Sequence, residues 1–348
     1  MIYVNKILMG SCLEVLKDLP DKIVNTCVTS PPYYGLRDYG VSGQLGLEKT
    51  PEEYIEKLVL IFREVKRVLR DDGTLWLNLG DSYSGSGKGR ESDGFKKNGG
   101  KQGTNKGTIN GMLQKTSVLD LKPKNLIGIP WRVAFALQAD GWYLRQDIIW
   151  NKPSPMPESV KDRCTKSHEY IFLLSKNPKY YYDSDAIKEP ITDTSVIRLM
   201  QNIDSQKSSD RAVGKSKNMK AMGSTKSFDK SQGGGGSSFV GHSGYKKADG
   251  TLLTDGFRNK RDVWTVPTKP YKEAHFAVYP EELIQPCILA GCPESGVVLD
   301  PFGGSGTTAF VSKKYARNYI LIELNPEYKK IADKRLSNIE YSLFLEEG

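Results

Sequence analysis

The segment Ser30-Pro31-Pro32-Tyr33 places a hydroxyl group, two carbonyl groups and an aromatic ring next to one another. Proline has no amide hydrogen and stiffens the backbone, so a proline carbonyl and the Ser30 hydroxyl can both accept hydrogen bonds from one amino group. Two such acceptors favour the pyramidal form of a planar amine and free its lone pair for attack on an electrophilic carbon. The Tyr33 ring would stack on the ring that carries the amine. The alternative is a stiff surface turn, which is common for a lone Pro-Pro-Tyr sequence.

A second segment with chemical potential runs from the apolar residues Val297–Asp300 into the turn Pro301-Phe302-Gly303-Gly304-Ser305-Gly306. Glycines let a ligand approach the backbone, and the amides of a helix predicted to begin at Thr307-Thr308 would face that ligand. Glu323 ends the next apolar run and can accept hydrogen bonds from both hydroxyls of a ribose. The spacing fits neither a P-loop nor the Gly-x-Gly-x-x-Gly fingerprint. The pattern therefore indicates NAD or S-adenosylmethionine, unless the turn is purely structural.

The elements that position these segments follow from the alternation of short apolar runs with amphipathic stretches, which is typical of an α/β fold. Most of the runs are too apolar to have a solvent face, so we expect helices on both faces of the sheet. We predict a Rossmann-like, seven-stranded, mostly parallel sheet with an inserted target-recognition region. The predicted strands are Lys6–Met9, Thr26–Thr29, Thr74–Leu79, Gln146–Trp150, Glu169–Ser175, Val297–Asp300 and Tyr319–Glu323.

The helix Pro51–Arg70 has the clearest signals of the predicted helices. Thr50 is its expected N-cap, Glu53 completes a capping box, and apolar side chains recur along one face. The other predicted helices are Trp131–Ala139 and Pro326–Asn338.

Composition narrows the class of protein. The 348 residues carry a formal net charge of +9, which favours a polyanionic partner without proving one. The five cysteines form no Cys-x-x-Cys pair and only three histidines accompany them, so neither a disulfide framework nor a metal site is predicted. No signal peptide or membrane-spanning run is evident, so we expect a cytoplasmic protein.

Together the two segments resemble the motifs of amino-group DNA methyltransferases of the beta order, in which the catalytic motif precedes the cofactor motif. Thr29–Tyr33 is similar to the catalytic motif and Asp300–Gly306 to the cofactor motif. The resemblance covers nearly the whole chain outside two Gly-rich regions. It implies S-adenosyl-L-methionine as the cofactor and double-stranded DNA as the partner. If Val297–Asp300 and Tyr319–Glu323 begin the cofactor half of the sheet, the next strand must come from Lys6–Met9.

The resemblance also implies roles for single residues. The implied catalytic residues are Ser30, Pro31, Pro32 and Tyr33. The implied cofactor contacts are Ser11, Phe276, Tyr279, Asp300, Phe302, Gly303, Gly304, Gly306, Thr307, Thr308 and Glu323. The residues expected to contact the base or the DNA are Tyr34, Arg37, Trp150 and Lys152. The family usually has an acid after the glycine that follows the N-terminal strand, whereas Ser11 follows Gly10 here and can form only a weaker hydrogen bond to the cofactor adenine.

The expected organisation has three parts, defined by residue numbers. Residues 1–182 form the catalytic half, residues 183–261 the target-recognition region, and residues 262–348 the cofactor half. Ser84–Gly111 and Asp204–Gly250 are rich in Gly, Ser, Lys and Asn, which predicts either flexible surface insertions or basic arms that order on a phosphate backbone. A restriction endonuclease is a possible counterpart, and the oligomeric state is not evident from the sequence.

The target base is read from the first residue of the catalytic motif. In the family Ser is more typical of cytosine N4 enzymes, whereas Asp or Asn is usual among adenine N6 enzymes. Ser30 therefore favours cytosine N4, with adenine N6 as the alternative. A non-catalytic DNA-binding module on the same fold is a third reading, and the two complete motifs argue against it.

Methylation of cytosine carbon 5 would require a thiolate nucleophile, and Pro286-Cys287 is the only pair of this kind that the sequence offers. It lies in the apolar stretch Glu282–Ala290, where we interpret Cys287 as a buried structural residue. Replacing Cys287 by Ala should leave the transfer of labelled methyl groups largely intact. Loss of transfer in a stably folded Cys287→Ala variant would indicate thiolate chemistry instead.

Overall fold

The central element of the fold is an eight-stranded sheet in the order β1-β10-β9-β2-β3-β5-β4-β8. The computed structural model describes residues 2–85, 121–192, 256–269 and 278–345, with residues 338–345 described by their backbone alone. All neighbouring strands are parallel except β5, which is antiparallel to both β3 and β4. The strands are β1 Lys6–Met9, β2 Val24–Thr29, β3 Leu69–Leu79, β4 Tyr143–Asn151, β5 His168–Ser175, β8 Val263–Thr265, β9 Val297–Asp300 and β10 Asn318–Glu323.

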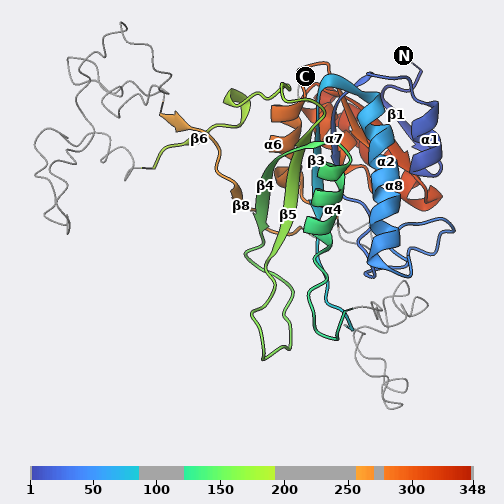
Figure 1. Cartoon of the computed structure of the whole chain (residues 1–348). Coiled ribbons are helices and arrows are strands. Elements are labelled where there is room, and N and C mark those ends of the chain that lie inside the picture. The colour runs from blue at the N-terminus through green and yellow to red at the C-terminus, as the bar shows by residue number, and fades with distance from the viewer. Residues whose placement is uncertain (1, 86–120, 193–255, 270–277, 346–348) are drawn as a thin grey trace, which may run out of the picture. The chain divides into compact units, whose positions relative to one another are not determined.

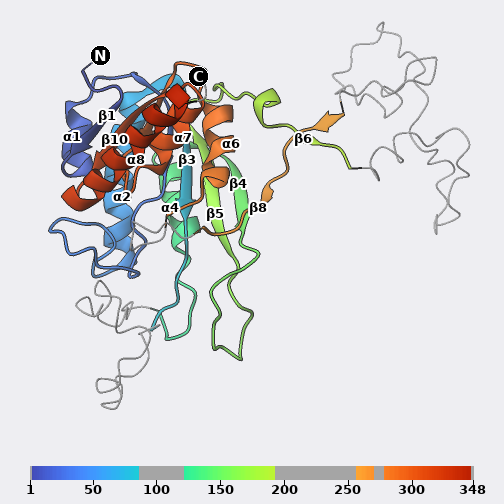
Figure 2. The same ribbon diagram turned by 180° about the vertical axis from the view of Figure 1, so that it is seen from behind.

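Helices cover both faces of this sheet, as the apolar strands require (Figure 1, Figure 2). One face is covered by α1 Cys12–Asp18, α2 Pro51–Val68 and α4 Ile129–Ala139, and the other by α6 Glu281–Gly291, α7 Thr307–Lys314 and α8 Pro326–Leu345. Leu58 and Phe62 of α2 are fully buried on the first face, and Trp76 of β3 packs with α6 on the second. The predicted α/β class with a mostly parallel sheet is confirmed.

Several details of the sequence prediction were wrong. Strands β2, β3 and β4 each begin earlier than predicted, and α8 extends to Leu345 rather than ending at Asn338. The sheet has an eighth strand, β8, which pairs with β4 and is only three residues long, too short to leave a periodic signal. Helix α2 ends at Val68 rather than Arg70, because Leu69 already pairs with Val24 as the first residue of β3. The N-cap was predicted correctly, since the Thr50 hydroxyl accepts a hydrogen bond of 3.2 Å from the amide of Glu53.

The order of strands brings the two ends of the chain together in one sheet. Strand β1 pairs with β10, and this confirms the expectation that Lys6–Met9 continues the cofactor half. Strand β2 pairs with β9 through Thr26–Val298 and Cys27–Leu299. The carboxyl ends of β2 and β9 therefore lie side by side, which is where open α/β sheets bind ligands. The hairpin that joins β4 and β5 extends beyond the same edge, at the bottom of Figure 1.

The chain divides into two units, residues 1–187 with 261–348 and residues 188–260. Among the described residues of the second unit, β6 Glu189–Pro190 pairs with β7 Phe257–Arg258, and Glu189 forms an ion pair of 3.0 Å with Arg258. Residues 86–111 and the whole of Asp204–Gly250 lie outside the described part of the chain, so the predictions made for these stretches stay predictions.

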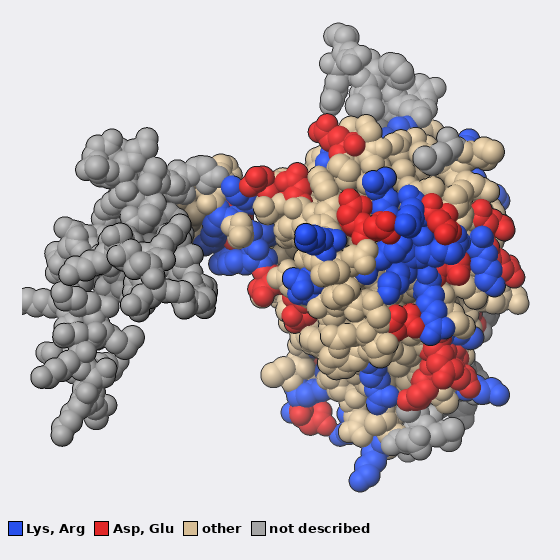
Figure 3. Space-filling view, turned by 45° about the horizontal axis from the view of Figure 1, so that its top comes forward, with Lys and Arg blue, Asp and Glu red and all other residues tan. Residues whose placement is uncertain are grey.

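Basic and acidic side chains are intermixed on the face shown in Figure 3. Ion pairs such as Lys22–Asp71, Arg67–Asp21 and Lys124–Asp162 join surface charges of opposite sign. No described helix has the length and apolar content that crossing a membrane requires.

Candidate active site

A cavity of about 760 Å³ is lined by residues from both halves of the sheet. Its walls are formed by the loop after β2, the glycine turn after β9 and the hairpin between β4 and β5. The carboxyl ends of β1, β3 and β10 also contribute. The predicted site residues that line it are Ser11, Ser30, Pro31, Pro32, Tyr33, Arg37, Trp150, Lys152, Tyr279, Phe302, Gly303, Gly304, Thr307 and Glu323. The structure thus brings together two segments that lie about 270 residues apart in the sequence.

The loop after β2 is held in place by buried side chains. Tyr54 of α2, which is fully buried, donates a hydrogen bond of 2.8 Å to the carbonyl oxygen of Pro32. The ring of Tyr33 lies against Gly80, where a Cβ atom would come within 2.5 Å of the ring. Any larger residue at position 80 would therefore push the Tyr33 ring out of its place. The loop presents its functional groups with little freedom, as an active site requires.

Three polar residues connect Ser30 and Tyr33 to the neighbouring strands. The Tyr33 hydroxyl donates to the carboxylate of Glu169 at 2.7 Å and lies 3.0 Å from Asn78 Oδ1. The Ser30 hydroxyl lies 3.2 Å from Asn78 Oδ1 and 3.4 Å from the Tyr33 hydroxyl, and its hydrogen can be donated to either. Lys152 forms an ion pair with the other oxygen of Glu169. Burial and the charge of Glu169 raise the pKa of Tyr33 well above its ordinary value, so the phenol stays protonated.

Glu169 and Asn78 were not predicted as site residues from the sequence, although both line the cavity. Their positions depend on the antiparallel pairing of β5 with β3 and β4, which places Asn78 opposite Ile171 and Glu169 opposite Trp150. The only local sign of a functional role was that each is a polar residue within a largely apolar strand, Asn78 in β3 and Glu169 in β5. A buried polar group inside a strand needs a partner, and this requirement could have identified them.

The cofactor turn is organised by Asp300, whose side chain is almost completely buried. Its carboxylate accepts hydrogen bonds of 2.6 Å from each of the hydroxyls of Thr29 and Thr308, and it also accepts from the hydroxyl of Tyr279 and the amide of Phe302. Burial raises the pKa of Asp300, and these hydrogen bonds oppose that rise. Asp300 does not line the cavity; it ties the end of β9 to the end of β2.

Glu323 at the end of β10 lines the cavity and also holds the turn. Its two carboxylate oxygens accept hydrogen bonds of 2.7 Å, one from the amide of Gly304 and one from the amide of Asn325. Burial is the main cause of its raised pKa. The hydroxyl of Ser305 is buried beside this turn and has no hydrogen-bond partner among the described residues. The cavity therefore contains both an acceptor and an unused hydroxyl for a polar ligand.

The remaining predicted residues lie behind the cavity wall or outside the described chain. Tyr34 is 3% exposed; its ring packs on Tyr54 and its hydroxyl donates to the carbonyl of Lys49. Gly306 and Thr308 do not line the cavity. Gly306 packs against Ala332 of α8, and the Thr308 hydroxyl donates a hydrogen bond to Asp300. Phe276 lies outside the described residues.

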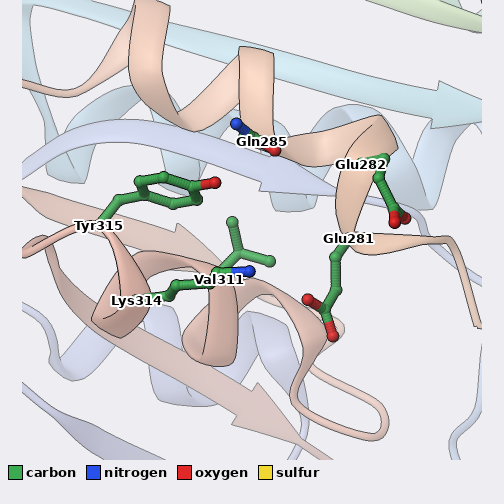
Figure 4. A pocket seen from close by; sticks show the side chains of 6 residues that line it. All are labelled: Glu281, Glu282, Gln285, Val311, Lys314 and Tyr315. Atoms are coloured by element: carbon green, nitrogen blue, oxygen red, sulfur yellow. The ribbon is translucent and has the colours of Figure 1, made fainter. Parts of the chain in front are cut away.

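A second, small hollow lies between α6 and α7 (Figure 4). It holds only about 40 Å³, and its two acids are already paired, Glu281 with Arg335 and Glu282 with Lys269. The hollow is lined by Glu281, Glu282, Gln285, Val311, Lys314 and Tyr315. It offers no cluster of reactive groups comparable to the large cavity.

Comparison with known proteins agrees with this geometry. A family model described as DNA methylase (N6_N4_Mtase) matches residues 24–334. The type II methyltransferase M.Cfr9I of Citrobacter freundii is 44% identical over 327 residues, which is 94% of this chain and 86% of that protein.

Two solved structures share the fold. A PvuII DNA methyltransferase described as cytosine-N4-specific superposes with a TM-score of 0.56 at 17% identity, covering 95% of this chain and 85% of the other. A putative DNA modification methylase of Thermus thermophilus, solved in complex with S-adenosyl-L-methionine, superposes with a TM-score of 0.51 at 19% identity, covering 95% and 94%.

Gly306 provides a test of how tightly the cofactor turn is built. Its φ is +79°, and a Cβ atom there would lie 2.8 Å from the Cβ of Ala332 in α8. We expect Gly306→Ala to lower the free energy of unfolding in urea by about 2 kcal/mol or more, because a left-handed backbone and a clash act together. Gly40→Ala is the matched control, since Gly40 has a φ of +71° and open space around it. Equal losses in the two variants would show that α8 yields to the added methyl group.

Proposed function

This chain belongs to the DNA methylase family of amino-group methyltransferases that use S-adenosyl-L-methionine, and we propose that it methylates the N4 amine of cytosine in double-stranded DNA. One observation carries the proposal. The Ser30-Pro31-Pro32-Tyr33 segment and the glycine turn with Glu323 line the same cavity, so an amine bound at the first segment can face a methyl donor bound at the second.

The catalytic segment fits an exocyclic amine. The Ser30 hydroxyl and a proline carbonyl accept hydrogen bonds from the two amine hydrogens, which directs the nitrogen lone pair toward the donor. The base reaches this position by leaving the duplex, and stacking on the Tyr33 ring offsets part of the few kcal/mol that unstacking costs. Trp150, whose ring lies 4.2 Å below the Lys152 ammonium, adds a second aromatic surface at the cavity wall.

The other end of the cavity fits the cofactor. S-adenosyl-L-methionine supplies an electrophilic methyl group on a sulfonium centre. Glu323 accepts hydrogen bonds from the ribose hydroxyls, and the unpartnered Ser305 hydroxyl suits a polar group of the methionine portion. Gly304 leaves open space toward the cavity, since the nearest atom to a Cβ there is 3.9 Å away. Ser11 and Tyr279 complete the cofactor wall, and Phe302 packs beside the adenosyl group.

Ser30 supports cytosine over adenine as the target base, because Ser at the first position of the catalytic motif is more typical of cytosine N4 enzymes. Adenine N6 methylation is the alternative, and the same acceptors serve both amines. Residues 183–261 form the target-recognition region in this proposal, where phosphate contacts supply affinity and base contacts set the sequence. Because M.Cfr9I is a type II methyltransferase, we propose that this chain protects DNA beside a restriction endonuclease.

The proposed function predicts a defined product. Unmodified bacterial DNA incubated with the protein and labelled S-adenosyl-L-methionine should acquire N4-methylcytosine, measured by digestion and mass analysis of the nucleosides. Ser30→Ala and Tyr33→Ala should each lower methyl transfer by at least about tenfold, because an acceptor or a stacking surface is lost. N6-methyladenine as the only product would overturn the base assignment. An active parent with unaffected Ser30→Ala and Tyr33→Ala variants would remove this segment from catalysis.

The role of Glu323 predicts how cofactor affinity depends on pH. Burial raises the pKa of Glu323, so its carboxyl group takes up a proton at a higher pH than an exposed glutamate does. Acceptance of hydrogen bonds from the ribose hydroxyls is therefore lost as the pH falls through this raised pKa. We expect cofactor affinity, measured by calorimetry, to fall with decreasing pH in the parent protein. Glu323→Gln should bind about tenfold or more weakly at neutral pH and with a flatter profile. Asp300 titrates in both proteins, so only the difference between the profiles reports on Glu323. Identical slopes would contradict the assignment.

A further inference from the structure

Glu169 is a carboxylate inside the cavity to which the sequence motifs assign no role. It is the second residue of β5, and its side chain is 15% exposed. One carboxylate oxygen is paired with Lys152, and the other accepts the hydrogen bond from Tyr33 at 2.7 Å. Asn78 Nδ2 lies 3.4 Å from this second oxygen. The carboxylate is thus fixed on both sides rather than free to rotate.

A line of hydroxyl groups connects this carboxylate to the position of the amine. The Ser30 hydroxyl lies 3.4 Å from the Tyr33 hydroxyl, which donates in turn to Glu169. Such distances are often longer before substrate binds and shorten in the complex. Asn78 cannot take up a proton, but its amide oxygen lies within 3.2 Å of both hydroxyls and holds them together. Each hydroxyl can accept one proton while it gives up its own.

The methylation of an amine requires a group that accepts a proton. When the nitrogen forms a bond to the methyl carbon, the carbon–sulfur bond breaks and its electron pair stays on sulfur. The nitrogen then carries a positive charge and must lose one of its two protons to give the neutral methylamine. A protonated amine on an aromatic ring is a strong acid, so an ordinary carboxylate is basic enough to receive that proton.

We propose that Glu169 accepts the proton released by the amine, and that the proton moves through the hydroxyls of Ser30 and Tyr33. The nitrogen–hydrogen bond breaks, the Ser30 and Tyr33 hydroxyls each exchange one proton, and an oxygen–hydrogen bond forms on Glu169. This inference rests on the proposed amino-group methylation of DNA.

The charged groups around Glu169 come from several elements. Lys152 and Lys166 lie on the hairpin between β4 and β5, His168 precedes Glu169 on β5, and Asp81 follows β3. Burial lowers the pKa of Lys166, while the charges of Asp81 and Glu169 act in the opposite direction. The Lys152 ammonium pairs with the Glu169 carboxylate and balances its negative charge in the cavity.

The test compares single-turnover methyl transfer to unmodified bacterial DNA in Glu169→Gln, Tyr33→Phe and the double variant. Tyr33→Phe keeps the stacking ring and removes only the hydroxyl. We expect each single variant to be slower by about 100-fold, the lower end of what a positioned proton acceptor contributes. The double variant should be no slower than either, since both residues act on one path. If the fold-decrease in rate of the double variant equalled the product of the two single fold-decreases, the relay would be overturned.

Two further measurements separate proton acceptance from a structural role. The affinities for S-adenosyl-L-methionine and for DNA should be unchanged in Glu169→Gln, whereas a residue that only shapes the cavity would alter them. The rate of Glu169→Ala should rise with pH and with added formate, and not with sodium chloride at the same ionic strength. Glu169→Asp should recover part of the rate. If the methyl-transfer rate of Glu169→Ala changed neither with pH nor with added formate, the proposal would be contradicted.

Glu64→Gln is the matched control, because it removes a part-buried carboxylate paired with Arg67 on α2, outside the cavity lining. Its rate should equal that of the parent. Failure of this inference is distinct from failure of the proposed function. A parent that transfers no methyl group to a DNA amine would refute the function, whereas an active parent matched by Glu169→Gln would refute only the role of Glu169.

Discussion

The buried carboxylate of Asp300 is the constraint on which the rest of the site depends. A carboxylate removed from water requires several donors, and it obtains them from β2, from the start of α7, from Tyr279 and from its own turn. Satisfying this one group fixes the end of β9 against the end of β2. The spacing between the Ser30-Pro31-Pro32-Tyr33 segment and the glycine turn then follows from the pairing of two strands rather than from the loops themselves.

Much of this arrangement could be predicted from the sequence because it is local. The strand–turn–helix around Gly303 and Gly304 has its own residue pattern, and Thr50 is recognisable in the sequence as the N-cap of α2. The position of β1 beside β10 followed from counting which strand was still missing. The roles of the predicted site residues as ligand contacts remain predictions, since the structure describes where they lie and not what they bind.

The rest could not be predicted because it depends on pairing between distant segments. Glu169 and Asn78 approach Tyr33 only because β5 runs antiparallel between β3 and β4. Nothing in the sequence around Tyr34 distinguishes it from Tyr33, yet the first ring packs on Tyr54 and the second lines the cavity. Asp300 is part of the cofactor motif although it does not line the cavity. A motif can include residues that hold the site in shape as well as residues that contact a ligand.

The pairing of β1 with β10 and of β2 with β9 also has a consequence for the synthesis of the chain. Among the described strands, β1 is synthesised before all others and β10 after all others, yet the two are neighbours in the sheet. Strand β2 likewise has no partner on its β9 side until residue 300 has been made. The open edge of β2 is thus exposed during most of translation, when unpaired strands are prone to aggregate. Helices α1 and α2, which contact each other and lie close to β2 in the sequence, cover one face of this part of the sheet. Contacts between such distant residues slow folding, and the cavity depends on them because it is lined from both the β2 side and the β9 side of the sheet.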